Sequence, residues 1–394
     1  MNGNVSREGI TADLEAMRRT GIGGAQVFVP SEGIPAGPAK YLGDEWRADF
    51  VFAASECRRL GLELGMHNCA GWSSSGGPWV TPELAMQEVV TSATRVGGPA
   101  RYSGVLPRPA AKLEPYRDIA VLAFPAPAGG VAFTMTGTAV PRVAIVNLTR
   151  RMAADGRLDW DAPPGDWIVL RAGFAPNGAR NHPAPPEGTG LECDKFSARA
   201  VDAHFNAVTG DLLRELGPLA GTAFRNLIIY SYEVGEQGWT PGFEREFLRL
   251  RGYDPVPYLP VLAGQTVDSA GVSNRFLRDL RRTFADLFAE KYYGRMAELA
   301  HAKGLRLGVE PYYGPFEGLA CGGRADIPMG EFWIGGGELD TCKLAASAGH
   351  TYGRRIIGAE AFTASPEDAG WRQHPGSMKM FGDRAFTAGI NRLI

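Results

Sequence analysis

The chain repeats one local pattern, an amphipathic helical stretch that ends at a glycine and leads within a few residues into a short apolar run. The helical stretches and their glycines are 9–20 with Gly21, 45–60 with Gly61, about 274–303 with Gly304, and about 343–352 with Gly353. Glycine is the usual residue just past a helix end, and an apolar run after it predicts a buried strand. Helices that alternate with buried strands are typical of a parallel sheet covered by helices.

Three of the predicted strands end in polar residues, which are His67-Asn68, Glu310 and Glu360. In (β/α)₈ barrels the catalytic groups lie at this carboxyl end of the strands. An open doubly wound sheet has the same alternation, but it usually carries a glycine-rich phosphate loop after its first strand, and we find no such loop here. The pattern therefore favours an α/β fold of the TIM-type (β/α)₈ barrel class.

The helical spacing is lost between residues 91 and 190. Short β-like runs, such as 119–124 and 167–171, alternate there with turns rich in proline and glycine. We therefore predict a discontinuous barrel domain, 1–90 and 191–394, with a mostly-β domain inserted at 91–190.

The charge balance excludes some partners. Lys and Arg number 41 against 43 Asp and Glu, which gives a formal net charge of -2 and no strong field for nucleic acid or anionic lipid. No stretch reaches the roughly 18 apolar residues of a membrane helix. The first residues, MNGNVSREGI, also lack the apolar core of a signal peptide. We expect neither a nucleic acid nor a membrane as partner, and localisation stays open because an export signal can precede Met1 in a longer protein.

The five cysteines lie far apart and form no CxxC pair. Their spacing and odd number predict neither a disulfide framework nor a zinc site. Buried free thiols are the expected state.

Glu233 follows the apolar run 227–230 and opens a loop that mixes carboxylates, amides and Trp239, as sugar sites do. Its position at a predicted strand end makes it a candidate catalyst. An acid of an ordinary surface loop is the alternative interpretation.

Two more glutamates stand at predicted strand ends. Glu360 lies among small and apolar residues, so its carboxylate must be hydrogen-bonded or paired if it is buried. Glu310 precedes Tyr312 and Tyr313, whose rings offer faces for a sugar. The alternative for both acids is a structural role in bracing a neighbouring loop.

Further polar and aromatic residues are candidates for sugar binding, each with a structural alternative. His67 can bind hydroxyls or satisfy the loop backbone, Glu331 beside Trp333 can be a site acid or a rim residue, and Asp194 can favour a helix N-terminus. The residues that we assign to substrate binding are His67, Asn68, Trp72, Asp194, Lys195, Trp239, Tyr312, Glu331 and Trp333.

Several glutamates at barrel strand ends, with Trp and Tyr nearby, fit glycoside hydrolysis by an acid and base pair. Oxidoreductases and kinases would need glycine-rich nucleotide loops, which we do not find. A Ser-His-Asp hydrolase is disfavoured because no G-x-S-x-G elbow is present.

The sequence resembles glycoside hydrolase family 106 through blocks that cover nearly the whole chain outside the predicted insertion. These blocks are NGNVSREGITADLEAM, LGLELGMHNCAGWSSSGGPWVTPE, GLECDKFS, RGYDPVPYLPVL, EPYYGPF, GGRADIPMGEFW, AASAGHTYG, GAEAFT and GDRAFTAGINR. Strings of this length are far more specific than any single acid.

The resemblance implies an inverting, exo-acting α-L-rhamnosidase that cleaves terminal rhamnose from polysaccharides or glycosides. It also implies two essential glutamates, which match Glu233 and Glu360, and a calcium ion that assists sugar binding. We assign Glu310 and Asn68 as calcium ligands, since calcium prefers hard oxygen ligands. We expect Glu233 to be the general acid, on the argument that an apolar surround raises a carboxyl pKa, and Glu360 to be the base. An inverting pair lies roughly 6.5–9.5 Å apart, against about 5–5.5 Å for a retaining pair.

Two departures from the family limit this reading. The fourth strand reads Tyr230-Ser231-Tyr232-Glu233 where an Asp-Ser-Trp-Glu-like string is expected, so the polarity beside the acid differs. Family members are also longer, and the resemblance therefore predicts a barrel truncated at both ends. Members of the family are often periplasmic or secreted in bacteria.

Two alternatives stay open. One is a retaining glycosidase of another specificity on the same barrel. The other is an inactive or carbohydrate-binding fragment. In each case the partner is a carbohydrate.

Overall fold

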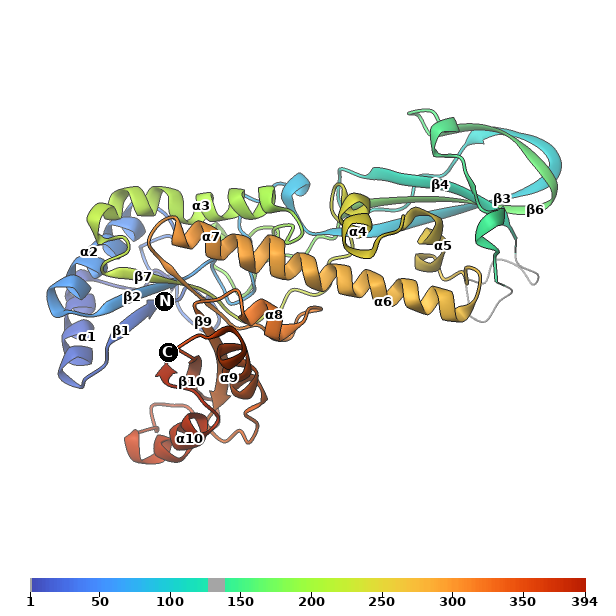
Figure 1. Ribbon diagram of the computed structural model, residues 1–394. Coiled ribbons are helices and arrows are strands. Elements are labelled where there is room, and N and C mark those ends of the chain that lie inside the picture. The colour runs from blue at the N-terminus through green and yellow to red at the C-terminus, as the bar shows by residue number, and fades with distance from the viewer. Residues whose placement is uncertain (1, 127–138) are drawn as a thin grey trace. The chain divides into compact units, whose positions relative to one another are not determined.

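The computed structural model describes residues 2–126 and 139–394, so part of the predicted insertion, 127–138, lies outside the described residues. The chain divides into two compact units (Figure 1). The first comprises Met1–Leu84, Ala179–Glu236 and Asp286–Ile394, and the second Ala85–Gly178 and Gln237–Ala285. We describe each unit by itself.

The first unit is built on a parallel sheet whose strands pair in chain order. Its strands are β1 (Gly24–Val27), β2 (Glu63–His67), β7 (Phe224–Ile229), β8 (Arg306–Val309), β9 (Ile327–Trp333), β10 (Gly358–Thr363) and β11 (Arg392–Leu393). Parallel order without exchange of neighbours is the order of a barrel. The α/β class and the parallel arrangement predicted from the sequence are confirmed.

The sheet is curled but open. One cavity of about 1010 Å³ is lined by residues of both edge strands, β1 and β11, which requires the sheet to bend round. Within the described residues, however, β1 and β11 do not pair with each other. The observed architecture is therefore a curled half-barrel, and the complete eight-stranded barrel stays a prediction.

The helices that connect the parallel strands end at or next to the glycines identified in the sequence. The helices of this unit are α1 (Arg7–Arg19), α2 (Asp44–Leu60), α3 (Ala198–Leu216), the π-helical η7 (Phe288–Gly294), α7 (Arg295–His301), α8 (Gly318–Gly322), α9 (Asp340–Tyr352) and α10 (Pro375–Thr387). Ser6 caps α1 by accepting a hydrogen bond from the backbone N–H of Gly9. Gly61 and Gly353 end α2 and α9 with φ of 68° and 69°, a left-handed conformation that glycine adopts without steric cost.

Helices α2, α3 and α7 form a layer on the sheet, with α2 packed against α3 and α3 against α7 (Figure 1). The strands beneath are apolar, and Leu64, Met66 and Leu227 are each no more than 1% exposed. Burial of each such side chain contributes about 1.5–3 kcal/mol. The burial of these strand residues is consistent with their reading as continuous apolar runs.

The second unit contains an antiparallel sheet in the order β3-β6-β4-β5. Its strands are β3 (Gln87–Val105), β4 (Arg117–Pro125), β5 (Val146–Asn147) and β6 (Arg157–Pro176), and its helices are α4 (Phe243–Arg251), η6 (Val256–Tyr258), α5 (Leu259–Leu262) and most of α6 (Ala270–Leu287). Trp160 and Trp167 meet edge to face in its core, with ring centres 5.4 Å apart.

The boundaries of this unit differ from the sequence prediction. The strands fall where the β-like composition was found, but the unit begins at Ala85, ends its first part at Gly178, and takes in residues 237–285. The sequence prediction places these residues in the barrel, with a helical pattern that begins at about 274. Their apolar faces pack within the second unit, and the backbone N–H of Trp239 donates to the carbonyl of Gln87. Periodicity predicts a helix but does not say which core the helix covers.

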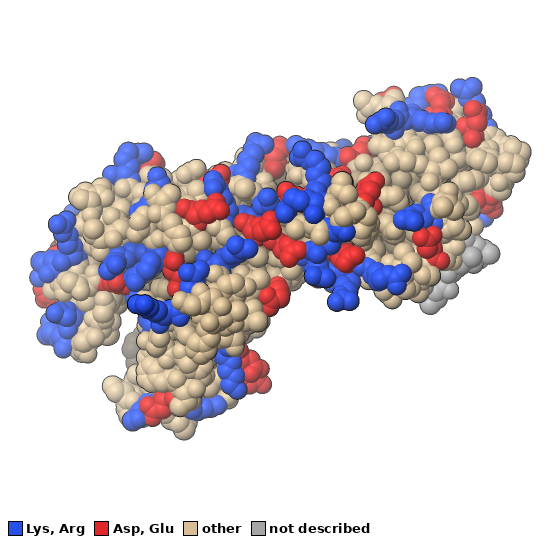
Figure 2. Space-filling view, in the orientation of Figure 1, with Lys and Arg blue, Asp and Glu red and all other residues tan. Residues whose placement is uncertain are grey.

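The surface agrees with the balanced composition. The face drawn in Figure 2 carries Lys and Arg interspersed with Asp and Glu. In the part of the chain that the structure describes, no helix is long and apolar enough to span a membrane.

One carboxylate ties the amino ends of four strands. Glu63, at the start of β2, pairs with Arg225 of β7 at 3.1 Å, Arg306 of β8 at 2.6 Å and Arg392 of β11 at 2.8 Å. Burial alone would raise the pKa of Glu63, but the hydrogen bonds and charges of Arg392 and Arg306 outweigh it, so the pKa is lowered. Glu63 thus links β11 to the centre of the sheet.

We predict that Glu63→Gln lowers the melting temperature at neutral pH by about 2–4 °C, for a loss of about 1–2 kcal/mol. A carboxyl whose folded pKa is lowered stabilises above its unfolded pKa, about 4.3, and this stability is lost as pH falls through the folded value. The difference between variant and wild type in thermal unfolding should therefore shrink on acidification. Asp211→Asn, which removes the exposed partner of Arg214, should change little at any pH. Equal effects of the two substitutions would contradict the role of Glu63.

Candidate active site

Four glutamates stand at the carboxyl ends of four adjacent strands. Glu233 follows β7, Glu310 follows β8 directly, and Glu331 and Glu360 lie within β9 and β10. Glu331 and Glu360 are paired in register, so their side chains point to the same face of the sheet. The parallel order therefore gathers four carboxyl groups at one edge, which we call the glutamate cluster.

Glu360 is partly buried, and its Oε1 accepts a hydrogen bond from the Thr363 hydroxyl at 2.5 Å. Burial raises the pKa of this carboxyl. The negative charges of Glu331 and Glu233 raise it further, against the opposing effect of the Thr363 hydrogen bond. Glu233 is thus close enough for its negative charge to act on the carboxyl of Glu360.

Glu310 is only 1% exposed. Its Oε2 accepts a hydrogen bond from the backbone N–H of Ser231 at 3.0 Å, while Oε1 makes no well-formed hydrogen bond with any described residue. Burial raises the pKa of Glu310 well above its usual range, and the charge of Glu360 adds to the effect. A buried carboxyl without a cation beside it holds its proton or requires a positive ligand.

Glu233 is exposed and is held at both carboxylate oxygens. The Trp72 indole donates to Oε2 at 3.1 Å, and the Ser231 hydroxyl donates to Oε1 at 2.7 Å. The ring nitrogen Nε2 of His182 lies 2.9 Å from the Glu233 carbonyl oxygen, to which it donates in one tautomer. The apolar surround that we expected for Glu233 is therefore wrong, because polar donors and solvent surround it. Of the two predicted catalytic residues, Glu233 and Glu360, the one with a partly buried carboxyl is Glu360.

Exposed aromatic residues stand beside the glutamate cluster. The Tyr313 hydroxyl donates to Glu331 Oε1 at 2.8 Å, and Trp333, the last residue of β9, is 43% exposed. Tyr312, in contrast, is buried, so the face available to a sugar belongs to its neighbour Tyr313. Tyr313 and Phe362 both have φ near +60°, which is rare for bulky residues and is found mostly at functional sites.

His67 and Asn68 are buried at the end of β2. Burial lowers the pKa of His67 to about 4, so its ring is neutral near pH 7, with Nδ1 at 3.0 Å from the carbonyl of Ile228. The Asn68 amide donates to the carbonyl of Ser74 at 3.1 Å. Both side chains serve the loop after β2, which is the structural alternative considered for His67.

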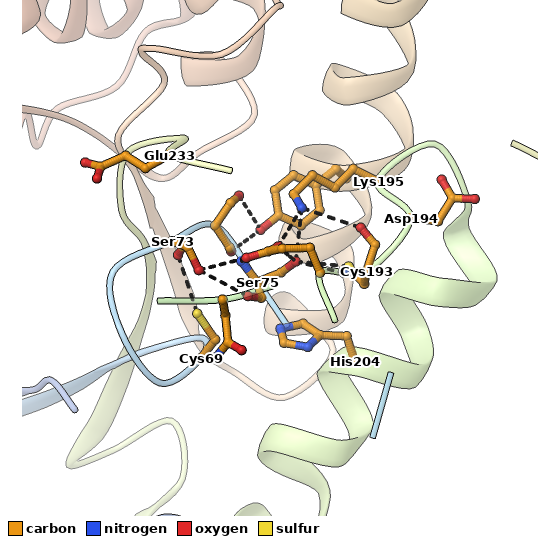
Figure 3. Close-up of polar contacts among 12 residues, drawn as sticks. Cys69, Ser73, Ser75, Cys193, Asp194, Lys195, His204 and Glu233 are labelled. Carbon is orange, nitrogen blue, oxygen red and sulfur yellow. Dashed lines mark hydrogen bonds and ion pairs between the residues drawn. The ribbon is translucent and has the colours of Figure 1, made fainter. Parts of the chain in front are cut away.

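Asp194 and Lys195 are buried as well. Figure 3 shows Lys195 in a polar network, with the Asp194 carboxylate turned away from that network and the Glu233 carboxylate pointing away from Lys195. Lys195 pairs with Glu192 at 2.8 Å, and both side chains have no exposed surface. Asp194 Oδ1 accepts from the backbone N–H of Phe196, just before α3. A direct role in sugar binding is not supported for either residue.

Trp239 belongs to the second unit and is fully buried against Phe243, with ring centres 4.4 Å apart. It is therefore a core residue of that unit. Trp239 is assigned to substrate binding in the sequence analysis because its loop has the composition of a sugar site.

Three residues of the site were missed by the sequence analysis. Ser231 contacts both Glu233 and Glu310, Thr363 contacts Glu360, and Glu192 neutralises Lys195. A signal existed for Ser231 and Thr363, since each lies two or three residues from a glutamate at a strand end. Glu192 stands three residues before Lys195, but the sequence does not show that both are buried.

The predicted calcium ligands are placed in different surroundings. Glu310 lies in the glutamate cluster, whereas the Asn68 amide contacts Ser74 and the Tyr292 hydroxyl. Among residues 2–126 and 139–394, no three His, Cys, Asp or Glu side chains are arranged to hold a metal ion. The five cysteines, as expected, are buried free thiols.

The chain is 46% identical, over its whole length, to a Formosa agariphila protein that carries the provisional name beta-glucuronidase, of which it spans 36%. The solved structure of a rhamnosidase from Novosphingobium sp. PP1Y matches the whole chain with a TM-score of 0.90 at 30% identity, and the chain covers 54% of it. The chain thus spans about half of this structure and about a third of the relative.

A family model described as alpha-L-rhamnosidase matches residues 1–130 and 128–394, which together make up the whole chain. The chain therefore belongs to glycoside hydrolase family 106, the α-L-rhamnosidase family.

Proposed function

We propose that the chain is the catalytic core of an exo-acting α-L-rhamnosidase that inverts the anomeric centre and removes terminal rhamnose from polysaccharides or glycosides. The observation that carries the proposal is the glutamate cluster, which places Glu233 and Glu360 at the carboxyl ends of β7 and β10, with Glu310 and Glu331 on the two strands between them, in a family 106 fold. Two carboxyl groups on such a rim are the minimum for acid and base catalysis of glycoside hydrolysis. The same placement supports the proposal that the curled sheet is part of a (β/α)₈ barrel.

The name of the Formosa agariphila relative suggests a second sugar, a glucuronide. A glucuronide carries a carboxylate, and four neighbouring glutamates would repel it. Rhamnose is neutral, so electrostatic repulsion does not oppose its binding. The glutamate cluster therefore favours the rhamnoside over the uronide.

We propose Glu233 as the general acid and Glu360 as the base. In an exo-acting enzyme the terminal sugar enters the pocket and the leaving group points to solvent, so the acid belongs at the exposed edge, where Glu233 lies. The base activates water deeper in the pocket, where Glu360 is partly buried. This argument from exposure replaces the one from an apolar surround.

The sugar contacts that we propose are the exposed or partly exposed members of the predicted set. These are Glu331 and Trp333, together with Tyr313 in place of Tyr312. Trp72 borders the acid through its hydrogen bond. His67, Asn68, Asp194 and Lys195 support the loops behind the pocket.

Calcium remains a proposal based on the family. Glu310 Oε1 is buried and makes no well-formed hydrogen bond with a described residue, so it fits a hard cation, and nearby negative charge would stabilise that cation. Asn68 stays a proposed ligand as well: its amide nitrogen donates to Ser74 and Tyr292, while its Oδ1, the atom that would bind calcium, makes no hydrogen bond with a described residue. A bound cation would supply positive charge for sugar hydroxyl oxygens, and its remaining ligands would be neutral oxygens.

We predict that Glu233→Gln slows hydrolysis of rhamnosides with poor leaving groups by roughly 10²–10⁴-fold and of activated aryl rhamnosides far less. Only the poor leaving groups require protonation. Glu360→Gln should slow both classes alike. Steady-state kinetics on aryl and alkyl α-L-rhamnosides provide the measurement, and Glu298→Gln, at an exposed residue paired with Arg295, is the matched control.

The same kinetics separate the alternatives. Proton NMR of the first-formed sugar distinguishes inversion from the retaining mechanism. Parallel assays on aryl glucuronides test the second sugar. If the chain turns over no glycoside, the carbohydrate-binding interpretation replaces the enzymatic one.

The raised pKa of Glu360 sets the pH dependence. A base acts as the carboxylate, so activity should fall as pH drops through a pKa that lies above that of an ordinary glutamate. Glu331→Gln removes one of the charges that raise the pKa of Glu360. We predict that the acidic limb of kcat/KM against pH moves to lower pH in this variant. If the acidic limb of kcat/KM stays at the same pH in Glu331→Gln, or moves to higher pH, the assignment of Glu360 as base is wrong.

We predict that exhaustive chelation reduces activity and that added calcium restores it, with tighter calcium binding in wild type than in Glu310→Gln. Isothermal titration of the apoprotein with calcium gives a readout that is independent of turnover. Full activity after chelation, together with no calcium binding, would remove the metal from the proposal.

A further inference from the structure

The loop that follows β2, Asn68–Gly77, carries Trp72, and we call it the Trp72 loop. Its serines, Ser73, Ser74 and Ser75, have no exposed surface. Polar groups buried to this degree need hydrogen-bond partners from elsewhere in the fold. The partners of these serines show what fixes the loop.

Glu192 binds the loop through both carboxylate oxygens. The Ser73 hydroxyl donates to Oε1 at 2.7 Å, and the Ser75 hydroxyl donates to Oε2 at 2.5 Å. Lys195 Nζ donates to the same Oε2 at 2.8 Å. The Glu192 carboxylate thus accepts hydrogen bonds from the loop and from a buried cation.

Lys195 also lies between two aromatic rings. Its Nζ is 5.5 Å from the ring centres of both Tyr232 and Tyr292. Tyr292 comes from the π-helical segment η7, and its hydroxyl donates to the carbonyl of Ser74. Tyr232 immediately precedes Glu233. The buried pair therefore contacts the Trp72 loop directly and the backbone beside Glu233 through a ring.

A second set of contacts to the Trp72 loop is made by His182. Its carbonyl accepts from the backbone N–H groups of Trp72 and Ser73 at 3.0 and 3.1 Å, and its ring contacts the Glu233 carbonyl. The carbonyl lies so close to Gly71, where φ is 81°, that a Cβ there would come within 2.5 Å of it. The backbone of the Trp72 loop is held from both sides.

The network does not touch the Glu233 carboxylate itself. In Figure 3 that carboxylate points away from Lys195. The connection is made by the Trp72 indole, which donates to Glu233 Oε2. Trp72 is the loop side chain that reaches the predicted acid.

Burying Glu192 and Lys195 is costly, because both charges lose their hydration, and apolar side chains would fill the same space at lower cost. Such pairs are best explained where they fix one conformation. Here the conformation that they fix is that of the Trp72 loop.

We propose that Trp72 is a positioning residue for the Glu233 carboxylate, and that the Glu192–Lys195 pair holds Trp72 in place through Ser73 and Ser75. This inference rests on the proposed function in that Glu233 is the acid. The contact itself does not depend on which sugar is cleaved.

The first experiment compares Trp72→Phe with Trp79→Phe. Trp79 is the matched control, because it lies just after the same loop and its indole donates to His204 Nδ1 at 3.1 Å rather than to Glu233. Trp72→Phe should lower kcat for poor leaving groups by about tenfold or more, as expected for a lost hydrogen bond to a charged group, with KM little changed. Activated substrates should be affected less. Trp79→Phe should leave the leaving-group dependence as in wild type. Equal behaviour of the two variants would overturn the proposal.

The second experiment removes both buried charges together, in Lys195→Met/Glu192→Gln, so that neither charge is left alone. Its leaving-group dependence should follow that of Trp72→Phe. When the three substitutions are combined, the loss should equal that of Trp72→Phe alone, because the pair acts through Trp72. Additive losses would show that the Glu192–Lys195 pair does not act through Trp72. If circular dichroism shows that the double variant is unfolded, Ser73→Ala, which removes one contact of Glu192, replaces it in the same cycle.

A third measurement separates this proposal from the proposed function. In protein labelled with ¹⁵N-tryptophan, the Trp72 indole resonance is the one lost in Trp72→Phe. Glu233→Gln and Lys195→Met/Glu192→Gln should both move it, while Glu233→Gln leaves the Trp79 resonance in place. An unmoved Trp72 resonance refutes the positioning contact even in an active enzyme. A moved resonance in a chain that cleaves no rhamnoside supports the contact and refutes the rhamnosidase assignment alone.

Discussion

Parallel pairing in chain order is the constraint on which the first unit depends. Parallel strands cannot be joined by hairpins, so each strand must be followed by a crossover that returns the chain to the same end. The consequence is that β7, β8, β9 and β10 all finish at one edge. Four carboxyl groups that are distant in the sequence become neighbours there, and their mutual repulsion is part of what raises the pKa of Glu360.

Much of this arrangement could be predicted from the sequence because it is local in origin. Gly61 and Gly353 mark helix ends through their left-handed backbone, and the apolar runs after such glycines form strands. Glu310 and Glu360 follow from the rule that barrel strands carry chemistry at their carboxyl ends. Glu233 was found in the same way, since it closes an apolar run.

The features that could not be predicted depend on burial and on distant partners. From the sequence, Lys195 is assigned to sugar binding, whereas in the structure Glu192 and two tyrosine rings enclose it. Trp239 has the same assignment, but it is buried within the second unit, where its backbone pairs with Gln87 of that unit. The surroundings of Glu233 were misjudged for the same reason, because Trp72 donates to it across 161 positions in the chain.

The crowding at Gly71 has a consequence for how such a site can diversify. A residue that leaves no room for a Cβ beside the His182 carbonyl allows almost no substitution, and the buried serines after it are similarly constrained. Trp333, beside the glutamate cluster, is 43% exposed, so close packing constrains its side chain far less. The site thus combines a loop that is fixed by its own packing with an exposed aromatic residue that leaves room for replacement. Relatives that recognise different sugars would be expected to differ at Trp333 while they keep Gly71 and the buried serines.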